Sequence, residues 1–420
     1  MCVGWTALVD LTHWKQIDQY CWLYSDAGSF PLIAYGDQQC VLRMHPQVLE
    51  QAWTLSQLPG LSTPVILLPD AHPGFAMPNG CVVGFDANHG GAILSGDIHL
   101  DHAYGVRCLK TGLQLSQLEP QLESLSETLQ SGLAAGLIQR GLAYCNQDSF
   151  DLMLRSGAHW AVEEGWGFLE DLQFCEHHGL MPSADPCAVS AHAKDYVQQR
   201  LKHFGNGNHH VELHVVDDVY DLSIASHLGL HVTSIVVVIE AGSAGLSQQT
   251  CRDNLSALHG LTWTPLHSEL GQQLLASIHA SLNCALAYRQ ILTHLVREVF
   301  RQYWPDLFLP LLVDASHNSV QKESHLVGHD PRHLWVQRQG STRAFGPCHG
   351  HIPDPYRQVG QPVLLGGGMG SFTEVLCGID SSEQRSLSTS CWNINGSLLS
   401  EKAGLVRRVA RLRPLRCIQG

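Results

Sequence analysis

Apolar runs bounded by glycine and proline alternate along this chain with segments of helical periodicity. Apolar residues at i, i+3 and i+4 predict helices over 45–60, 112–139, 190–203 and 268–303. Continuous or alternating apolar runs predict buried strands over 65–68, 211–215, 235–239 and 309–313. No Pro/Ser linker, charge run or internal repeat divides the chain. We therefore expect one large α+β domain over residues 1–420.

Polar side chains follow these strands or stand at glycine turns. They form four clusters: His99/Asp101/His102, Asn208/His209/His210, Glu240, and His317/Asn318. Carboxylate and imidazole groups are the ligands expected for a divalent ion such as Mn²⁺ or Fe²⁺. A histidine at a strand end is also commonly a hydrogen-bonded structural residue, so spacing alone leaves both interpretations open.

Composition narrows the class of protein. Of 420 residues, 44% are hydrophobic and 15% are charged, against about 25% charged in typical soluble domains. No apolar stretch approaches the roughly 18 residues that span a bilayer, so a soluble, cytoplasmic protein without a membrane partner is expected. The 14 cysteines are scattered without a CxxC pair, which favours reduced thiols over a disulfide scaffold.

The net charge of −13 argues against a general nucleic-acid coat protein, but the C-terminal region is locally basic. Its cations face only Glu401 in sequence: Lys402, Arg407, Arg408, Arg411, Arg413 and Arg416. Such a run could follow RNA phosphates, or it could form an ordinary solvated face on a terminal strand or helix.

Glycine-rich loops add a weaker signal for phosphate binding. Gly205 to Asn208 and Gly366 to Gly370 could direct backbone N–H groups at a phosphate. Neither is a Walker loop or a dinucleotide fingerprint. The chain also lacks a GxSxG elbow, an HExxH pair and a kinase signature, which excludes the commonest hydrolase and kinase classes.

A series of ordered motifs extends along nearly the whole chain: Pro69-Asp70-Ala71-His72, Gly105-Val106-Arg107, Gly157 to Asp185, Gly207 to Glu212, Ser316-His317-Asn318, Gly340 to Phe345, Val359 to Val363, Met369-Gly370 and Val409 to Leu415. Taken together, they resemble the RtcB-type RNA ligases. The resemblance implies a single domain over residues 1–420 with mixed sheets, surrounding helices and a central metal pocket. The resemblance implies the joining of RNA 2′,3′-cyclic phosphate or 3′-phosphate ends to 5′-hydroxyl ends, with GTP and Mn²⁺. It also implies RNA ends as partners and leaves an accessory protein open.

The resemblance implies a metal site at Asp101, His209, Glu240 and His317. Mn²⁺ is the first expectation for this set of oxygen and nitrogen donors, with Fe²⁺ or Mg²⁺ as alternatives. Nucleotide or phosphate contacts are implied at Asn208, Glu212, Arg343, Gly368, Met369 and Gly370. Arg107 is expected near the RNA path.

Five positions depart from the family pattern, one of them Ala244, which stands where the family has an arginine. Tyr104 stands where the family has a metal-bridging cysteine, and Glu240 where it has a metal-binding histidine. Trp392 aligns with the histidine that becomes linked to GMP, and an indole offers only an N–H donor. Gln419 replaces the lysine expected at guanine. Two hypotheses follow: altered metal chemistry on RNA phosphate ends without covalent GMP, or a ligase-dead relative that binds RNA ends or partners.

Overall fold

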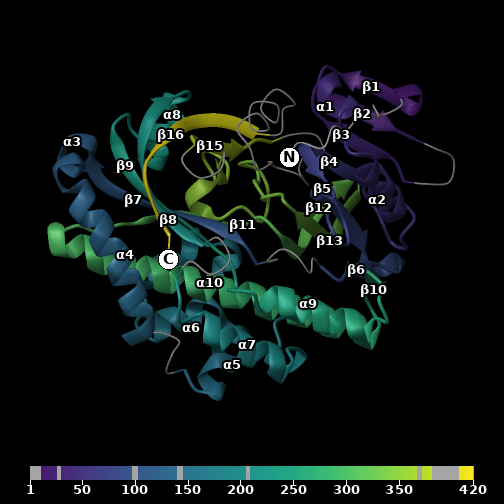
Figure 1. Cartoon of the computed structure of the whole chain (residues 1–420). Helices are drawn as coiled ribbons and strands as arrows, with labels where there is room; N and C mark the ends of the chain where they lie inside the picture. The colour runs from purple at the N-terminus through teal and green to yellow at the C-terminus, as the bar shows by residue number, and fades with distance from the viewer. Residues whose placement is uncertain are drawn as a thin grey trace, which may run out of the picture.

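The computed structural model describes residues 11–25, 30–96, 103–139, 145–204, 209–328, 330–366, 371–380 and 406–419. Within them the chain forms two seven-stranded sheets and a two-stranded ribbon. Most of the helices lie beneath the second sheet (Figure 1). The α+β class with mixed sheets and surrounding helices, predicted from the sequence, is confirmed.

The first sheet joins the N-terminal strands to a hairpin from the second half of the chain. Its order is β1 (Trp14–Asp18), β2 (Cys21–Tyr24), β3 (Leu32–Tyr35), β4 (Val65–His72), β5 (Asn79–Asp86), β13 (Asp330–Gln339) and β12 (Ser319–Val327). Only β3 and β4 run parallel among these pairs, and α1 (Gln38–Leu42) and α2 (Pro46–Ser56) make that crossover. Asp37 caps α1 by accepting from the N–H of Cys40 at 2.9 Å.

The second sheet is antiparallel at every described pair. Its order is β11 (Leu311–Ser316), β7 (Gly105–Gln114), β9 (Ser234–Ala241), β8 (His210–Val219), β16 (Val406–Gln419), β15 (Thr373–Gly378) and β14 (Pro362–Gly366). The ribbon pairs β6 (Ala92–Leu94) with β10 (Trp263–Pro265). Because β11 belongs to the second sheet and β12 to the first, the turn at His317 and Asn318 joins the two sheets.

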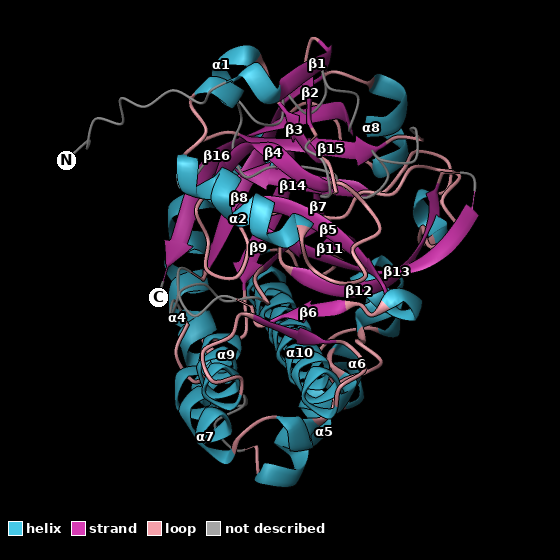
Figure 2. Ribbon diagram, turned by 90° about the vertical axis from the view of Figure 1, so that its right-hand side faces the viewer, coloured by secondary structure: helices cyan, strands magenta, loops and turns pink. Residues whose placement is uncertain are grey.

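Helix α10 (Glu269–Tyr303) runs beneath the second sheet and is the longest described helix (Figures 1 and 2). Ser268 caps it by accepting from the N–H of Gly271 at 2.9 Å. Its apolar face packs with the sheet and with α4 (Leu122–Gln139) in the largest core cluster. The opposite face of the sheet forms a second core with α8 (Leu222–Leu228). Successive residues of β8 and β9 therefore point alternately to the α10 core and to the α8 core.

The remaining helices surround these layers. They are α3 (Leu115–Leu118), α5 (Gln147–Ser156), α6 (Ala158–Glu163), α7 (Ala191–Arg200) and α9 (Leu246–Ala257). No helix among the described residues is long and apolar enough to cross a membrane.

The predicted helices over 45–60, 190–203 and 268–303 and the four predicted strands are confirmed. The helix over 112–139 begins later than predicted. Strand β7 continues to Gln114 because Gly112, at a φ of 74°, takes a left-handed conformation that interrupts but does not end the strand. Pro120 lies in a short 3-10 segment between α3 and α4, so the continuous helix starts at Leu122.

Candidate functional site

Four neighbouring strands of the second sheet, β11, β7, β9 and β8, have polar residues at the same end of the sheet. Ser316 pairs with Gly105, and Gly105 pairs with Ala241. On the next strand along, Glu240 pairs with His210. The alternating strand directions therefore bring Glu240, His317 and His209, the last one residue before β8, to the same end of the sheet.

His317 is buried at the junction of the two sheets. Its backbone N–H donates to the carbonyl of Tyr104 at 2.9 Å, and its Nδ1 shares a hydrogen bond with the Thr342 hydroxyl at 2.8 Å. Burial, and then the positive charge of Arg289, lower the pKa of His317 to about 3. The ring is thus neutral at physiological pH and oriented by a hydroxyl, as a metal-binding imidazole requires.

His209 lies on the α10 side of the sheet. Its Nε2 accepts a hydrogen bond from the backbone N–H of Gly242 at 3.1 Å, which assigns the ring proton to Nδ1 in the neutral form. Its ring centroid is 5.8 Å from that of Tyr104 and 5.4 Å from that of Tyr288. Tyr104 therefore lies between His209, through its ring, and His317, through its backbone.

Glu240 forms an ion pair with His210 on the neighbouring strand, with 3.2 Å between Oε2 and Nε2. Burial raises the pKa of the Glu240 carboxyl above its ordinary value, and His210 only partly offsets this effect. A carboxyl of this kind beside an imidazole can exchange a proton nearer to neutral pH than an exposed glutamate.

The donor types at this edge suit a divalent ion, but the described residues do not by themselves assemble a metal site. Val236 and Val238 pack in the α8 core and Ile239 and Ala241 in the α10 core, so Glu240 points to the α8 face. His209 contacts Tyr288 of α10, on the other face. No group of three or more His, Cys, Asp or Glu side chains among the described residues could hold an ion.

Several predicted site residues lie outside the described residues. They are His99, Asp101, His102, Asn208, Gly368, Met369, Gly370 and Trp392. Ala103 is the first described residue after Asp101, and His209 is the first after Asn208.

The two remaining candidate nucleotide contacts are both buried. Glu212 accepts from Nε2 of His214 at 2.7 Å, and although burial opposes ionisation, His214 and His210 lower the pKa of its carboxyl. Arg343 donates from Nη1 to the side-chain Oε1 of Gln321 at 3.0 Å, and its Nε is 3.7 Å from Oε1 of Glu176.

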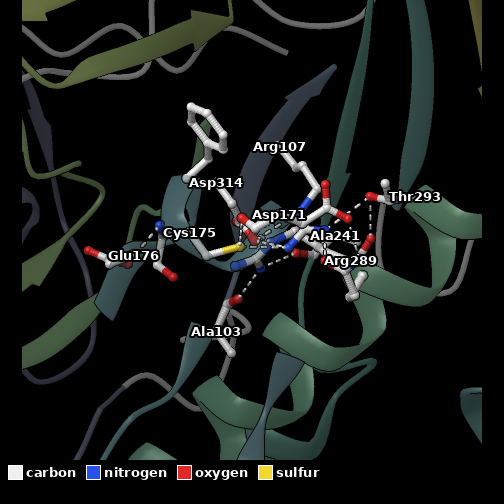
Figure 3. Close-up of polar contacts among 12 residues, drawn as sticks. Ala103, Arg107, Asp171, Cys175, Glu176, Ala241, Arg289, Thr293 and Asp314 are labelled. Carbon is white, nitrogen blue, oxygen red and sulfur yellow. Dashed lines mark hydrogen bonds and ion pairs between the residues drawn. The ribbon is translucent and has the colours of Figure 1, made fainter. Parts of the chain in front are cut away.

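Arg107 does not face an RNA path, contrary to the sequence-based expectation. Its side chain is fully buried and donates to Asp314 from Nε at 3.0 Å and from Nη2 at 2.5 Å (Figure 3). Its Nη1 donates to Gln290 at 2.6 Å and to Thr293 at 3.1 Å, both on α10. These partners occupy the guanidinium, so Arg107 ties β7 to β11 and α10.

The C-terminal arginines lie on β16, and carboxylates from neighbouring elements pair with them. Arg408 pairs with Glu374 at 2.9 Å, while Arg411 and Arg413 both contact Asp217. Arg407 lies 3.6 Å from Asp221, and Arg416 contacts Glu123. This pairing favours the alternative of an ordinary solvated face on a terminal strand, because strand pairing brings in acids distant in sequence.

This pairing makes a prediction for RNA binding. Replacing Arg408 and Arg411 together with alanine is expected to reduce the slope of log affinity against log salt by less than about 0.3, because each side chain is already paired with a carboxylate. Direct phosphate contacts would each remove about 0.7 from the slope for single-stranded RNA. Titration of the variant with a single-stranded RNA at several salt concentrations distinguishes the two results.

The sequence pattern did not identify Arg289, Asp314 or Glu176, which surround this sheet end. Arg289 is fully buried, and Glu176 accepts from the N–H of Ser316 at 3.1 Å, next to His317. The available signal was a charged residue within an otherwise apolar segment: Asp314 after Leu309 to Val313, and Arg289 on the apolar face of 268–303.

Comparison with known proteins identifies relatives of this chain. A family model described as tRNA-splicing ligase RtcB matches residues 51–392. The tRNA-splicing ligase RtcB of Thermococcus kodakarensis is 36% identical over 410 residues, covering 93% of this chain and 85% of that protein. The proteins of the same name from Archaeoglobus fulgidus and Methanococcus maripaludis are 33% and 32% identical, over 93% and 90% of this chain and 85% and 82% of their own lengths.

Proposed function

This chain belongs to the RtcB family of tRNA-splicing ligases, and from that membership we propose that it acts on RNA ends bearing a 3′-phosphate or 2′,3′-cyclic phosphate. The chemistry differs from the family pattern because no covalent GMP is formed at Trp392. The observation that supports this proposal is the register that gathers His209, Glu240 and His317 at one end of the second sheet.

The proposed cofactor is a divalent ion, Mn²⁺ first, with Fe²⁺ or Mg²⁺ as alternatives. Asp101, His209, Glu240 and His317 are its proposed ligands. When bound, such an ion supplies positive charge to a phosphate oxygen. To join this set, Glu240 must leave His210 and turn away from the α8 face, so the ion pair at 3.2 Å competes with the metal. His209 must likewise release the N–H of Gly242, because that contact occupies the lone pair of Nε2.

This chain's own residues have three roles in the proposal. Thr342 orients the His317 ring through their 2.8 Å hydrogen bond. The half-buried Tyr104 takes the place of the family's cysteine, with its ring beside His209. Before an ion binds, the Glu240 carboxyl, with its raised pKa, holds a proton beside His210, and it releases that proton when it turns to the ion. GTP is not required, because an indole at position 392 cannot accept a nucleotidyl group.

A second candidate function is a ligase-dead relative that binds RNA ends or a partner protein. It is favoured by the His210–Glu240 pairing and by the absence of a three-donor group in the described part of the chain. This candidate predicts affinity for RNA ends without a metal requirement.

The deciding experiment combines metal analysis, label transfer and end chemistry. Purified protein is expected to retain about one Mn or Fe ion per chain and to carry no label after incubation with α-labelled GTP. A 3′-phosphate RNA is expected to be bound, or changed at its end, only when the metal is present. His317→Ala is expected to lose the metal and the RNA effect together, whereas His279→Gln, a buried histidine of α10, should keep both.

Each other outcome has a defined meaning. Label on the protein contradicts the absence of a covalent GMP. No metal in the unmodified protein, with RNA-end binding intact, favours the second candidate. If the unmodified protein binds neither metal nor RNA ends, both proposals are overturned.

A further inference from the structure

Three arginines and two aspartates form a buried network between α10 and the second sheet, and Gln290 joins its two halves by contacting both Arg107 and Asp171. Figure 3 shows Arg107, Arg289, Asp171 and Asp314 of this network. Asp314 of β11 accepts from Arg107 and, at 2.8 Å, from Nε of Arg289. Asp171 accepts from Arg297 at 2.6 and 2.7 Å. Although burial acts to raise it, the two arginines at Asp314 hold the pKa of that carboxyl below its usual value. The network is therefore charged and fixed in geometry.

Arg289 differs from the other two arginines because it donates to backbone carbonyls at or next to two different strands of the second sheet. Its Nη1 donates to the carbonyl of Ala241 at 2.9 Å and to the carbonyl of Ala103 at 3.3 Å. One nitrogen thus joins the backbone at the end of β9 to the backbone that leads into β7.

Both carbonyls lie next to residues of the candidate site. Ala241 stands between Glu240 and Gly242, whose N–H donates to His209 at 3.1 Å. Ala103 precedes Tyr104, whose carbonyl accepts from the His317 N–H at 2.9 Å. Glu240 is therefore adjacent to a residue whose carbonyl Arg289 holds, and His209 and His317 are each one residue and one hydrogen bond from such a residue.

The space around Arg289 fits a close approach to the strand. A Cβ on Gly105 would lie 2.9 Å from Cζ of Arg289 and 2.7 Å from the carbonyl oxygen of Ala315. Only glycine at this position lets the guanidinium lie against the start of β7.

Arg297 provides a contrast on the same helix. It lies eight residues further along, about two turns, and is equally buried. Besides Asp171, it donates to the carbonyl of Leu309 at 2.9 and 2.7 Å, ahead of the start of β11 and away from the candidate site.

We propose that Arg289, held by Asp314, is a positioning residue that sets the spacing between the ends of β7 and β9 and so aligns His209, Glu240 and His317. The inference rests on the proposed function, because it takes this sheet end to be the site. Its structural content, that Arg289 orders the Gly242 and His317 amides, can be measured independently of any reaction.

The test compares Arg289→Lys with the matched control Arg297→Lys. Lysine keeps the charge but cannot donate to Asp314 and both carbonyls together. Hydrogen exchange at the Gly242 and His317 amides is expected to rise about tenfold or more in Arg289→Lys and to stay within about twofold in Arg297→Lys, at matched melting temperature. Mn²⁺ affinity is expected to fall about tenfold or more in Arg289→Lys only, as for residues that orient metal ligands.

The outcomes separate this inference from the proposed function. Unchanged exchange at Gly242 and His317 in Arg289→Lys, or an equal rise in Arg297→Lys, overturns the positioning role. If the unmodified protein binds no Mn²⁺, the proposed metal fails, while the exchange measurement still decides whether Arg289 positions the strand ends.

A second variant covers the case in which Arg289→Lys does not fold. Gly105→Ala keeps every charge, and its Cβ meets both the guanidinium of Arg289 and the backbone carbonyl of Ala315. The Gly242 amide is the decisive readout, because Gly242 follows β9, on the side of β7 away from Ala315. This variant is expected to give the same local rise in exchange at Gly242 and His317, and exchange equal to that of the unmodified protein contradicts the proposal.

Discussion

Replacing Asp314 with asparagine is expected to destabilise the folded chain by about 3 to 5 kcal/mol, the usual cost of breaking a buried ion pair. Asp314 is fully buried and accepts from Arg107 and Arg289, both also fully buried. Asparagine keeps the shape but removes the charge, so two guanidinium groups remain desolvated without their carboxylate. Since folded proteins are stable by only about 5 to 15 kcal/mol, the midpoint of urea unfolding should fall sharply.

Asp354→Asn is the matched control for this measurement. Asp354 pairs with Arg357 at 2.7 Å, but its side chain is 87% exposed. An exposed pair of this kind contributes at most about 1 kcal/mol, so the urea midpoint should hardly move. A loss in Asp314→Asn no larger than that in Asp354→Asn would contradict the assignment of Asp314 as the central acceptor of the network.

The parts of this fold that the sequence predicted are those whose signal is local. The long helix over 268–303 repeats its apolar positions within each turn, and the strand at 235–239 is a continuous apolar run. The burial of such segments can be predicted without knowing which other segments pack against them. By contrast, the extent of β7 depended on Gly112, whose left-handed backbone allows the strand to continue to Gln114.

The candidate site was predictable only in part, because its geometry depends on which strands pair. The sequence indicated His209, Glu240 and His317 as polar residues near strand ends, and antiparallel pairing brings those ends to one edge. It could not indicate that Glu240 would lie against His210, since that contact joins neighbouring strands.

The contacts of the arginines likewise depend on pairing between distant segments. Arg411 meets Asp217 because β16 pairs with β8, almost 200 residues earlier in the chain. Arg107 is buried because β7 lies between β11 and β9, above α10. In both cases the sequence shows the positive charge of the arginine, but the carboxylate that pairs with it is known only from the fold.

Acidification from pH 7 to pH 4 is expected to remove several kcal/mol of stability, and buried histidines supply the reason. Burial lowers the pKa of His279 to about 4, and its Nε2 is hydrogen-bonded to the Val320 carbonyl at 2.8 Å. In the unfolded chain a histidine titrates near about 6.5. Between these values the unfolded state binds more protons, so stability falls as pH falls, by about 3 kcal/mol for this residue.

His279→Gln isolates this contribution from the other groups that titrate in acid. A glutamine side chain carries an N–H donor for the Val320 carbonyl and does not titrate in this range. The unmodified protein and the variant share the carboxylates whose pKa is lowered, such as Asp314, so their losses cancel in the difference. The stability of the variant relative to the unmodified protein should therefore rise by about 3 kcal/mol between pH 7 and pH 4. Urea unfolding of metal-free samples across this range measures it, and parallel stability curves would mean that His279 is protonated in the folded chain.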